Sequence, residues 1–211
     1  MPYALAFSAD CRQVAAVGYD HDHDRYIMLF DAGTGDLQKI ITGNSDAPIA
    51  MAYSPVDMQL VAGYYDGTIR LWDPTTGDLQ KILVGHTDRV WNVAFSPDGT
   101  RVVSACHKAV NFWDAATGDL QGTSTYPYAR TVAFSPDGKQ AAACFNYHMI
   151  IWDAAGKVQK AIACQSAGIV TSMAFSPNGK EIVTGSDDTT IRRWGITLGD
   201  TENVVGHSGG L

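Results

Sequence analysis

The sequence has few cysteines, and none of them is spaced like the ligands of a zinc site. Its 211 residues include four, Cys11, Cys106, Cys144 and Cys164, and no two of them form a Cys-x-x-Cys pair. Cys106 and Cys144 lie in apolar stretches, which predicts buried, reduced thiols. Because disulfides persist mainly in oxidising compartments, this pattern predicts a reducing compartment and therefore a cytoplasmic protein.

Basic residues are also scarce. Lys and Arg number 15 against 22 Asp and Glu, which gives a formal net charge of −7. Nucleic acid is therefore not expected as a partner, because its binding depends on basic groups that contact phosphates. No apolar run approaches the roughly 18 residues of a membrane span, so no membrane association is expected. Residues 1–13 lack a basic stretch followed by a long apolar run, so we expect no secretory signal.

Two common catalytic motifs are missing as well. The chain contains neither the phosphate-binding G-x-x-x-x-G-K-[ST] nor the zinc-binding H-E-x-x-H. We therefore predict no enzymatic activity and no cofactor. One segment, Asp20–Asp24, combines carboxylates with His21 and His23, and such groups can bind zinc or nickel. Adjacent residues in one loop rarely preorganise a metal site, so we favour a solvated loop over a metal site here.

What the sequence does contain is a repeat. A segment similar to Ala-Phe-Ser-Pro-Asp-Gly occurs five times, at Leu5–Asp10, Met51–Asp57, Val93–Gly99, Val132–Gly138 and Met173–Gly179. Each copy is followed by an aromatic residue, and these residues recur every 39 to 42 positions: Phe30, Trp72, Trp113, Trp152 and Trp194. A period of this length is typical of one four-stranded blade of a β-propeller.

The third repeat shows the expected strands most clearly. Its first strand, Val90–Ser96, ends at the turn residues 97–99, and three further strands follow at Arg101–His107, Ala109–Asp114 and Leu120–Tyr126. The short connections predict an antiparallel meander. A single sheet of this kind cannot bury both of its faces, whereas radial stacking gives each face a neighbour.

We therefore predict an all-β fold of five four-stranded antiparallel blades, forming either a closed five-bladed ring or part of a larger propeller. The repeats reach both ends of the chain, so we assign one domain, residues 1–211, with repeats at about 3–47, 48–88, 89–127, 128–167 and 168–207. Aromatic residues at the ends of the first strands are expected to fill the space between blades: Phe7, Tyr53, Phe95, Phe134 and Phe175.

The repeats resemble those of the WD-repeat β-propeller family over essentially the whole chain. This resemblance implies a buried hydrogen-bonded tetrad in each blade, made of a His from a Gly-His pair, a second-strand Ser or Thr, an Asp in the next turn and the third-strand Trp. No repeat offers all four, which predicts modest stability. The candidates are His86, Ser104 and Trp113 in the third repeat, Thr184, Asp188 and Trp194 in the fifth, and Asp66 and Trp72 in the second.

The resemblance also implies a function, because propellers of this family mostly bind proteins through the face built from two sets of loops. Tyr, Trp and Arg, which dominate binding hot spots, are frequent at the positions that look onto this face. We therefore predict a non-catalytic protein–protein interaction scaffold or recognition module. The residues assigned to its partner-binding face are Tyr3, Tyr65, Arg89, Trp91, Tyr128, Arg130, Phe145 and Asp187.

Two alternative functions stay open at this point. The Gly-His segments also resemble, more weakly, the WD-repeat arrays of fungal NACHT-type signalling ATPases, so the chain could be a sensor or regulatory fragment of such a protein. A small-ligand or carbohydrate-binding propeller is the second alternative, by analogy of fold alone. If the ring does not close, the uncovered faces of its end blades favour self-association as well.

Overall fold

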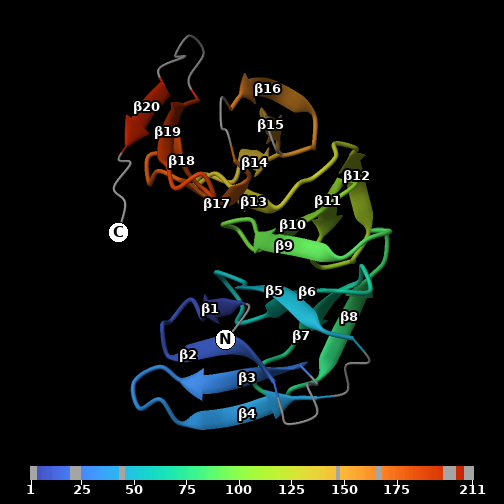
Figure 1. Cartoon of the computed structure of the whole chain (residues 1–211). Coiled ribbons are helices and arrows are strands. Elements are labelled where there is room, and N and C mark those ends of the chain that lie inside the picture. Colours follow the sequence, from blue (N-terminus) through green and yellow to red (C-terminus); the bar gives the residue numbers. More distant parts are fainter. Residues whose placement is uncertain are drawn as a thin grey trace.

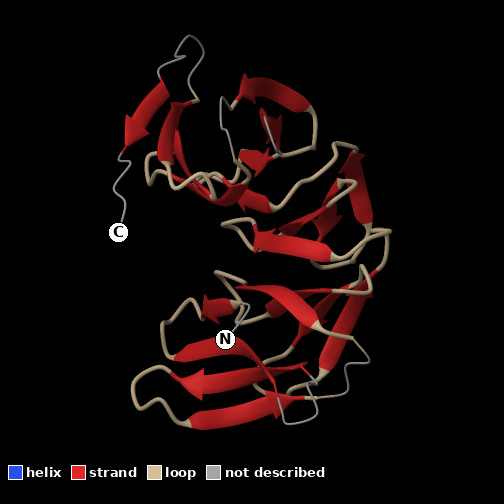
Figure 2. Cartoon of the chain, viewed as in Figure 1, coloured by secondary structure: helices blue, strands red, loops and turns tan. Residues whose placement is uncertain are grey.

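The computed structural model describes residues 4–19, 25–42, 46–145, 148–164, 168–196 and 203–206, and strands are the only regular elements in those ranges. The strands form five sheets of four, and each sheet consists of consecutive antiparallel strands (Figures 1 and 2). The predicted meander of five four-stranded blades is therefore confirmed. Within the same ranges, no helix has the length and hydropathy needed to cross a membrane.

We number the blades one to five in chain order. Blade one contains β1 (Leu5–Phe7), β2 (Gln13–Tyr19), β3 (Arg25–Asp31) and β4 (Leu37–Ile41). Blade two contains β5 (Pro48–Tyr53), β6 (Leu60–Tyr64), β7 (Ile69–Trp72) and β8 (Leu79–Leu83). Blade three contains β9 (Val90–Phe95), β10 (Arg101–Cys106), β11 (Val110–Asp114) and β12 (Leu120–Ser124). Blade four contains β13 (Thr131–Phe134), β14 (Gln140–Cys144), β15 (His148–Asp153) and β16 (Val158–Ala163). Blade five contains β17 (Val170–Phe175), β18 (Glu181–Ser186), β19 (Ile191–Gly195) and β20 (Asn203–Gly206).

The turn between the third and fourth strands explains why Asp follows the repeated aromatic residue. Asp73 Oδ1 accepts hydrogen bonds from the backbone N–H groups of Thr75 and Thr76, at 2.8 and 3.2 Å. Gly77 then adopts a φ of 85°, in the left-handed region that glycine tolerates best. The same turn recurs in blade three, where Asp114 Oδ1 accepts from the N–H of Thr117 at 2.8 Å. The repeated sequence therefore encodes a repeated turn.

Each pair of successive blades encloses an apolar cluster. Blades one and two share the cluster that contains Ile27, Leu29 and Tyr53, and the next pair shares one built around Ile69, Val93 and Phe95. Two similar clusters join blades three and four and blades four and five. Tyr53, Phe95 and Phe134 are buried there as expected, and Phe175 packs against the last cluster.

Phe7 does not fill a space between blades, contrary to the expectation from its repeat. The blades follow one another along an open arc, with β1–β4 at one end and β17–β20 at the other (Figure 1). None of the described core clusters joins these two end blades. Leu5 and Phe7 are consequently 56% and 57% exposed at one end, and Ile191 is 59% exposed at the other. Ile69 and Val110, which occupy the place of Ile191 in inner blades, are fully buried.

Candidate functional site

Loops of three successive blades bring a group of aromatic and cationic side chains together. Trp91 lies on β9 and Arg89 directly precedes that strand, whereas Tyr65 follows β6 and Tyr128 and Arg130 precede β13. All five were predicted from their positions in the repeats. His107, which follows β10, completes the group, and we call the six residues the Trp91 cluster: Tyr65, Arg89, Trp91, His107, Tyr128 and Arg130.

Two guanidinium groups lie over the aromatic rings. Arg89 Cζ is 4.5 Å from the ring centroid of Tyr65 and 5.0 Å from that of Trp91. Arg130 Cζ is 5.5 Å from the Trp91 ring. Cations at these distances are attracted by the negative faces of the rings. Trp91 is therefore contacted by two arginines, which limits the conformations of its side chain.

His107 contributes an uncharged ring to the cluster. Its imidazole stacks on Trp91 with centroids 5.1 Å apart and lies 5.7 Å from the ring of Tyr128. Desolvation lowers the pKa of His107 from its ordinary value, Asp88 opposes this effect, and Arg130 and Arg89 add to it. His107 is thus a neutral aromatic group at neutral pH. In the sequence His107 stands six residues before Trp113, where the tetrad aspartate would lie, and its contact with Trp91 depends on the tertiary structure.

Positive charge exceeds negative charge around the cluster. Asp88 is its nearby carboxylate, with Oδ1 3.9 Å from Arg89 Nε and Oδ2 4.0 Å from His107 Nδ1. Arg130 makes no ion pair with any residue that the structure describes, and Lys108 is likewise unpaired there. A chain with a net charge of −7 therefore carries a locally cationic, aromatic surface.

The other residues assigned to this face lie elsewhere or have different contacts. Phe145 is only 5% exposed, because it packs in the core between blades three and four with its ring 5.3 Å from that of Tyr126. Asp187 shapes its own loop, since its Oδ1 accepts from the N–H of Ile169 at 2.6 Å. Tyr3 lies outside the described residues.

Blade three contains the most complete of the predicted tetrads. Trp113 Nε1 donates to Ser104 Oγ at 2.8 Å, and His86 Nε2 lies 2.7 Å from the same oxygen. Burial lowers the pKa of His86 to about 4, so its imidazole is neutral and can accept the Ser104 hydroxyl proton. In blade five, Trp194 Nε1 donates to Thr184 Oγ1 at 2.9 Å.

Asp66 and Asp188 differ from the tetrad expectation in their described hydrogen bonds. Asp66 accepts from the backbone N–H and hydroxyl of Thr68, at 2.7 and 2.6 Å, and from an Arg70 guanidinium nitrogen at 2.8 Å. Trp72 instead donates to the hydroxyl of Tyr64 at 3.1 Å. The incoming Gly-His histidine is missing from this repeat, and the third-strand arginine pairs with the carboxylate within its own turn. Asp188 makes the equivalent bonds to Thr190 and Arg192.

Metal-ligating side chains are not gathered in the part of the chain that the structure describes. No set of three or more His, Cys, Asp or Glu side chains there could hold a metal ion. His21 and His23, the weak metal candidates, lie outside the described residues. A cavity of about 380 Å³ is lined by residues of the first strands and the loops before them, and Trp91, Asn92, Arg130 and Thr171 contribute to its wall. Its described lining contains no carboxylate.

Comparison with known families gives one match. A family model described as "WD domain, G-beta repeat" matches residues 35–73, 77–114 and 156–195, which together make up more than half of the chain. Each matched segment begins in or just after the turn that precedes a fourth strand and ends at the third strand of the next blade. No curated protein matches the chain.

Proposed function

The chain belongs to the WD-repeat family, and from this premise we propose that it is a non-catalytic interaction module that binds a protein through the Trp91 cluster. Repeats of this family generally mediate protein–protein interaction. The proposal for this chain concerns which surface does so.

The observation that carries the proposal is the composition and exposure of the cluster. Tyr65 and Tyr128 are about half exposed, at 49% and 52%, and Trp91 and both arginines are partly exposed beside them. Aromatic side chains and arginine give large contact areas with few rotatable bonds, which is why they dominate hot spots. Trp91 Nε1 and His107 Nε2 also have no hydrogen-bond partner among the described residues. An acceptor on a partner would satisfy Trp91 Nε1, and a donor would satisfy His107 Nε2 when the ring proton is on the Nδ1 that faces Asp88.

Alanine substitution tests this proposal once a partner has been isolated with the wild-type protein. Trp91→Ala and Arg130→Ala are each expected to weaken partner binding by a factor of ten or more, as hot-spot truncations do. Ile82→Ala, which truncates an exposed side chain on β8, serves as the matched control and should leave the Kd within twofold. If both cluster variants bind the partner like the wild type in calorimetry, the loop face is not the interaction surface.

We further propose that the uncovered faces of blades one and five associate with a second copy of the chain. Leu5 and Phe7 form part of a face that, in inner blades, packs against the preceding blade. Ile191 belongs to the opposite kind of face, which packs against the following blade. The two surfaces are thus the two halves of one interface type, which supports head-to-tail pairing.

Cysteine burial supports the proposed reducing, cytoplasmic location. All four cysteines are free thiols, and Cys106, Cys144 and Cys164 are buried. Burial raises the pKa of the Cys164 thiol to about 11, so this residue stays protonated and unreactive.

A further inference from the structure

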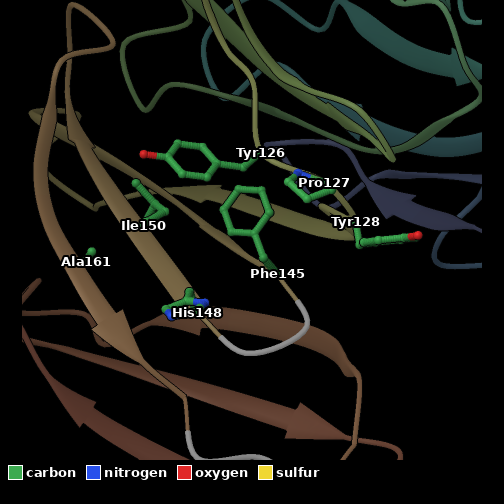
Figure 3. A pocket seen from close by; sticks show the side chains of 7 residues that line it. All are labelled: Tyr126, Pro127, Tyr128, Phe145, His148, Ile150 and Ala161. Atoms are coloured by element: carbon green, nitrogen blue, oxygen red, sulfur yellow. The ribbon is translucent and has the colours of Figure 1, made fainter.

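A cavity of about 530 Å³ opens between blades three and four, next to the Trp91 cluster. The β12–β13 loop forms one side of it, and Phe145 with parts of β15 and β16 forms the other (Figure 3). Its walls are mostly aromatic and aliphatic, with the imidazole of His148 as a polar group among them. The lining residues are Tyr126, Pro127, Tyr128, Phe145, His148, Ile150 and Ala161.

The cavity lies where blade three departs from the repeat. The fourth strands of blades one and two end in Ile41 and Leu83, which are 2% and 1% exposed and fill the space against the next blade. Blade three has Ser124 at this position, and Ser124 Oγ accepts a hydrogen bond from Trp152 Nε1 at 3.1 Å. The small side chain satisfies the tryptophan but fills less of the interface.

The loop that follows also differs from its counterpart. Before β9, His86 is buried with its ring 6.1 Å from that of Trp113. Before β13, Tyr126 and Pro127 occupy the corresponding place and no histidine enters the blade. Tyr126 lies against Phe145 and is partly exposed, so an apolar space stays open to the surface. Among the described residues, the chain thus has an aromatic-walled cavity at a position where Ile41 and Leu83 fill the interfaces that follow blades one and two.

One wall of the cavity belongs to the Trp91 cluster, which contains two arginines. Tyr128 lines the cavity and also lies 5.7 Å from His107, so the cavity and the Trp91 cluster share one wall. Arg130 is two residues further along and has no carboxylate partner among the described residues. The net charge of −7 repels an acidic partner at long range, but charges beyond roughly 8–10 Å are screened at physiological ionic strength. Arg130, which lines the neighbouring cavity of about 380 Å³, therefore offers its guanidinium to a partner's carboxylate at short range.

We infer that this cavity receives an aromatic or large aliphatic side chain of a protein segment whose neighbouring carboxylate binds Arg130. This inference rests on the proposed function and specifies the chemistry of the partner. The apolar walls match the aromatic or aliphatic side chain, because burial of apolar surface drives binding. The unpaired guanidinium of Arg130 matches the partner's carboxylate, because arginine binds carboxylates through paired N–H donors.

Selection from a displayed library of random dodecapeptides, with the full chain as bait, tests the inference without a known partner. We expect the enriched peptides to share one aromatic or large aliphatic residue within a few positions of an Asp or Glu. Ala161→Trp fills the cavity and should weaken these peptides at least tenfold in fluorescence polarisation. Ile82→Trp places the same side chain at the equivalent position of β8, outside the cavity, and should leave affinity within twofold.

Two further variants keep the result interpretable. Tyr126→Ala removes an exposed wall of the cavity without filling it, so a parallel loss of at least fivefold is expected even if Ala161→Trp folds poorly. Arg130→Ala should weaken an acidic peptide at least fivefold and its Asn or Gln analogue less than twofold.

The outcomes separate this inference from the proposed function. Enriched peptides without acidic residues, or peptides that bind the Ala161→Trp and Tyr126→Ala variants like the wild type, would overturn the inference, as would a library that yields no enrichment. Peptides whose affinity falls with Trp91→Ala but not with Ala161→Trp would support the loop face and overturn the cavity assignment. Peptides whose affinity falls with Ala161→Trp but not with Trp91→Ala would support the cavity and overturn the loop face as the binding surface.

Discussion

At the scale of single residues, a buried neutral histidine links two parts of blade three. His86 enters from the loop before β9, and its Nε2 meets Ser104 Oγ on β10 at 2.7 Å. Ser104 Oγ also accepts the N–H of Trp113, so three side chains from three segments share one oxygen. The arrangement satisfies a buried indole N–H that would otherwise cost about 1–3 kcal/mol. It works only while the imidazole is uncharged.

Acid should therefore destabilise the protein through His86 before its carboxylates matter. The folded-state pKa of about 4 lies below the ordinary value of 6.5, so the unfolded chain binds the extra proton first. Stability from this group is complete above about pH 6.5 and is lost as the pH falls toward 4, by roughly 3 kcal/mol at most. The free energy of unfolding from urea titrations at pH 7, 6, 5 and 4.5 measures the loss.

His86→Asn is the control, because it removes the titrating group. Its unfolding free energy should depend clearly less on pH over the same interval, with a small remainder from His107, whose pKa is also lowered. The paired carboxylates contribute at lower pH, since hydrogen bonds hold the pKa of Asp98 at about 2. Equal pH dependence in His86→Asn and wild type would contradict the assignment.

At the scale of elements, glycines with a positive φ occur in two different turns, one between β3 and β4 and one between β6 and β7. Gly35 lies in the β3–β4 turn at a φ of 78°, and an added Cβ would meet nothing within 4 Å. Gly67 lies in the β6–β7 turn at a φ of 84°, where an added Cβ would be 3.0 Å from the carbonyl oxygens of His86 and Asp88. The first turn only connects strands, whereas the second also packs against the loop that leads to Arg89 and Trp91.

Alanine at these two glycines should separate the cost of conformation from the cost of contact. Gly35→Ala is expected to lose about 1–2 kcal/mol of unfolding free energy, because its backbone is left-handed. Gly67→Ala should lose at least about 1 kcal/mol more, since the methyl group also presses on two carbonyl oxygens. Chemical denaturation of both variants measures the difference. Equal losses would show that the β6–β7 turn moves away from the loop without cost.

At the scale of the whole molecule, the arc leaves two apolar faces uncovered. Each inner blade buries both faces against neighbours, whereas blades one and five each bury one. Exposed apolar patches of this kind mark interaction surfaces. The missing tetrad members lower the stability of the single chain, because each absent internal hydrogen bond removes on the order of 1 kcal/mol from the free energy of unfolding. Association through the end faces would offset part of that loss by mass action.

Light scattering should therefore give a mass that rises above the 22.7 kDa of one chain as concentration increases. The double variant Phe7→Asp and Ile191→Asp places a charge on each end face and should return the mass to that of a monomer. Val84→Asp introduces the same charge at a 74% exposed position just beyond β8 and should behave like the wild type. The proposal of end-face association is refuted if the wild-type chain is monomeric both at its solubility limit and after 200-fold dilution from it.

Much of the fold was predictable because its signals are local. A period of 39 to 42 residues, turns similar to Pro-Asp-Gly and an Asp after four of the five repeated aromatic residues specify four short strands and their connections within one repeat. The positions of Tyr65, Arg89, Trp91, Tyr128 and Arg130 followed from the same register, because residues at strand ends look onto the loop face. Strand alternation and turn geometry act over a few residues, so one repeat contains the information.

Contacts between repeats could not be predicted from the sequence. The stacking of His107 on Trp91, the burial of Phe145 and the cavity beside Ala161 each depend on side chains from different blades. The opening of the arc depends on the angle between successive sheets, which no single repeat encodes. The repeats encode the blades, whereas packing across the interfaces determines which faces are covered and where a partner can bind. The physical reason is that turns and strand pairing are short-range, but shape complementarity between sheets is a property of all of them together.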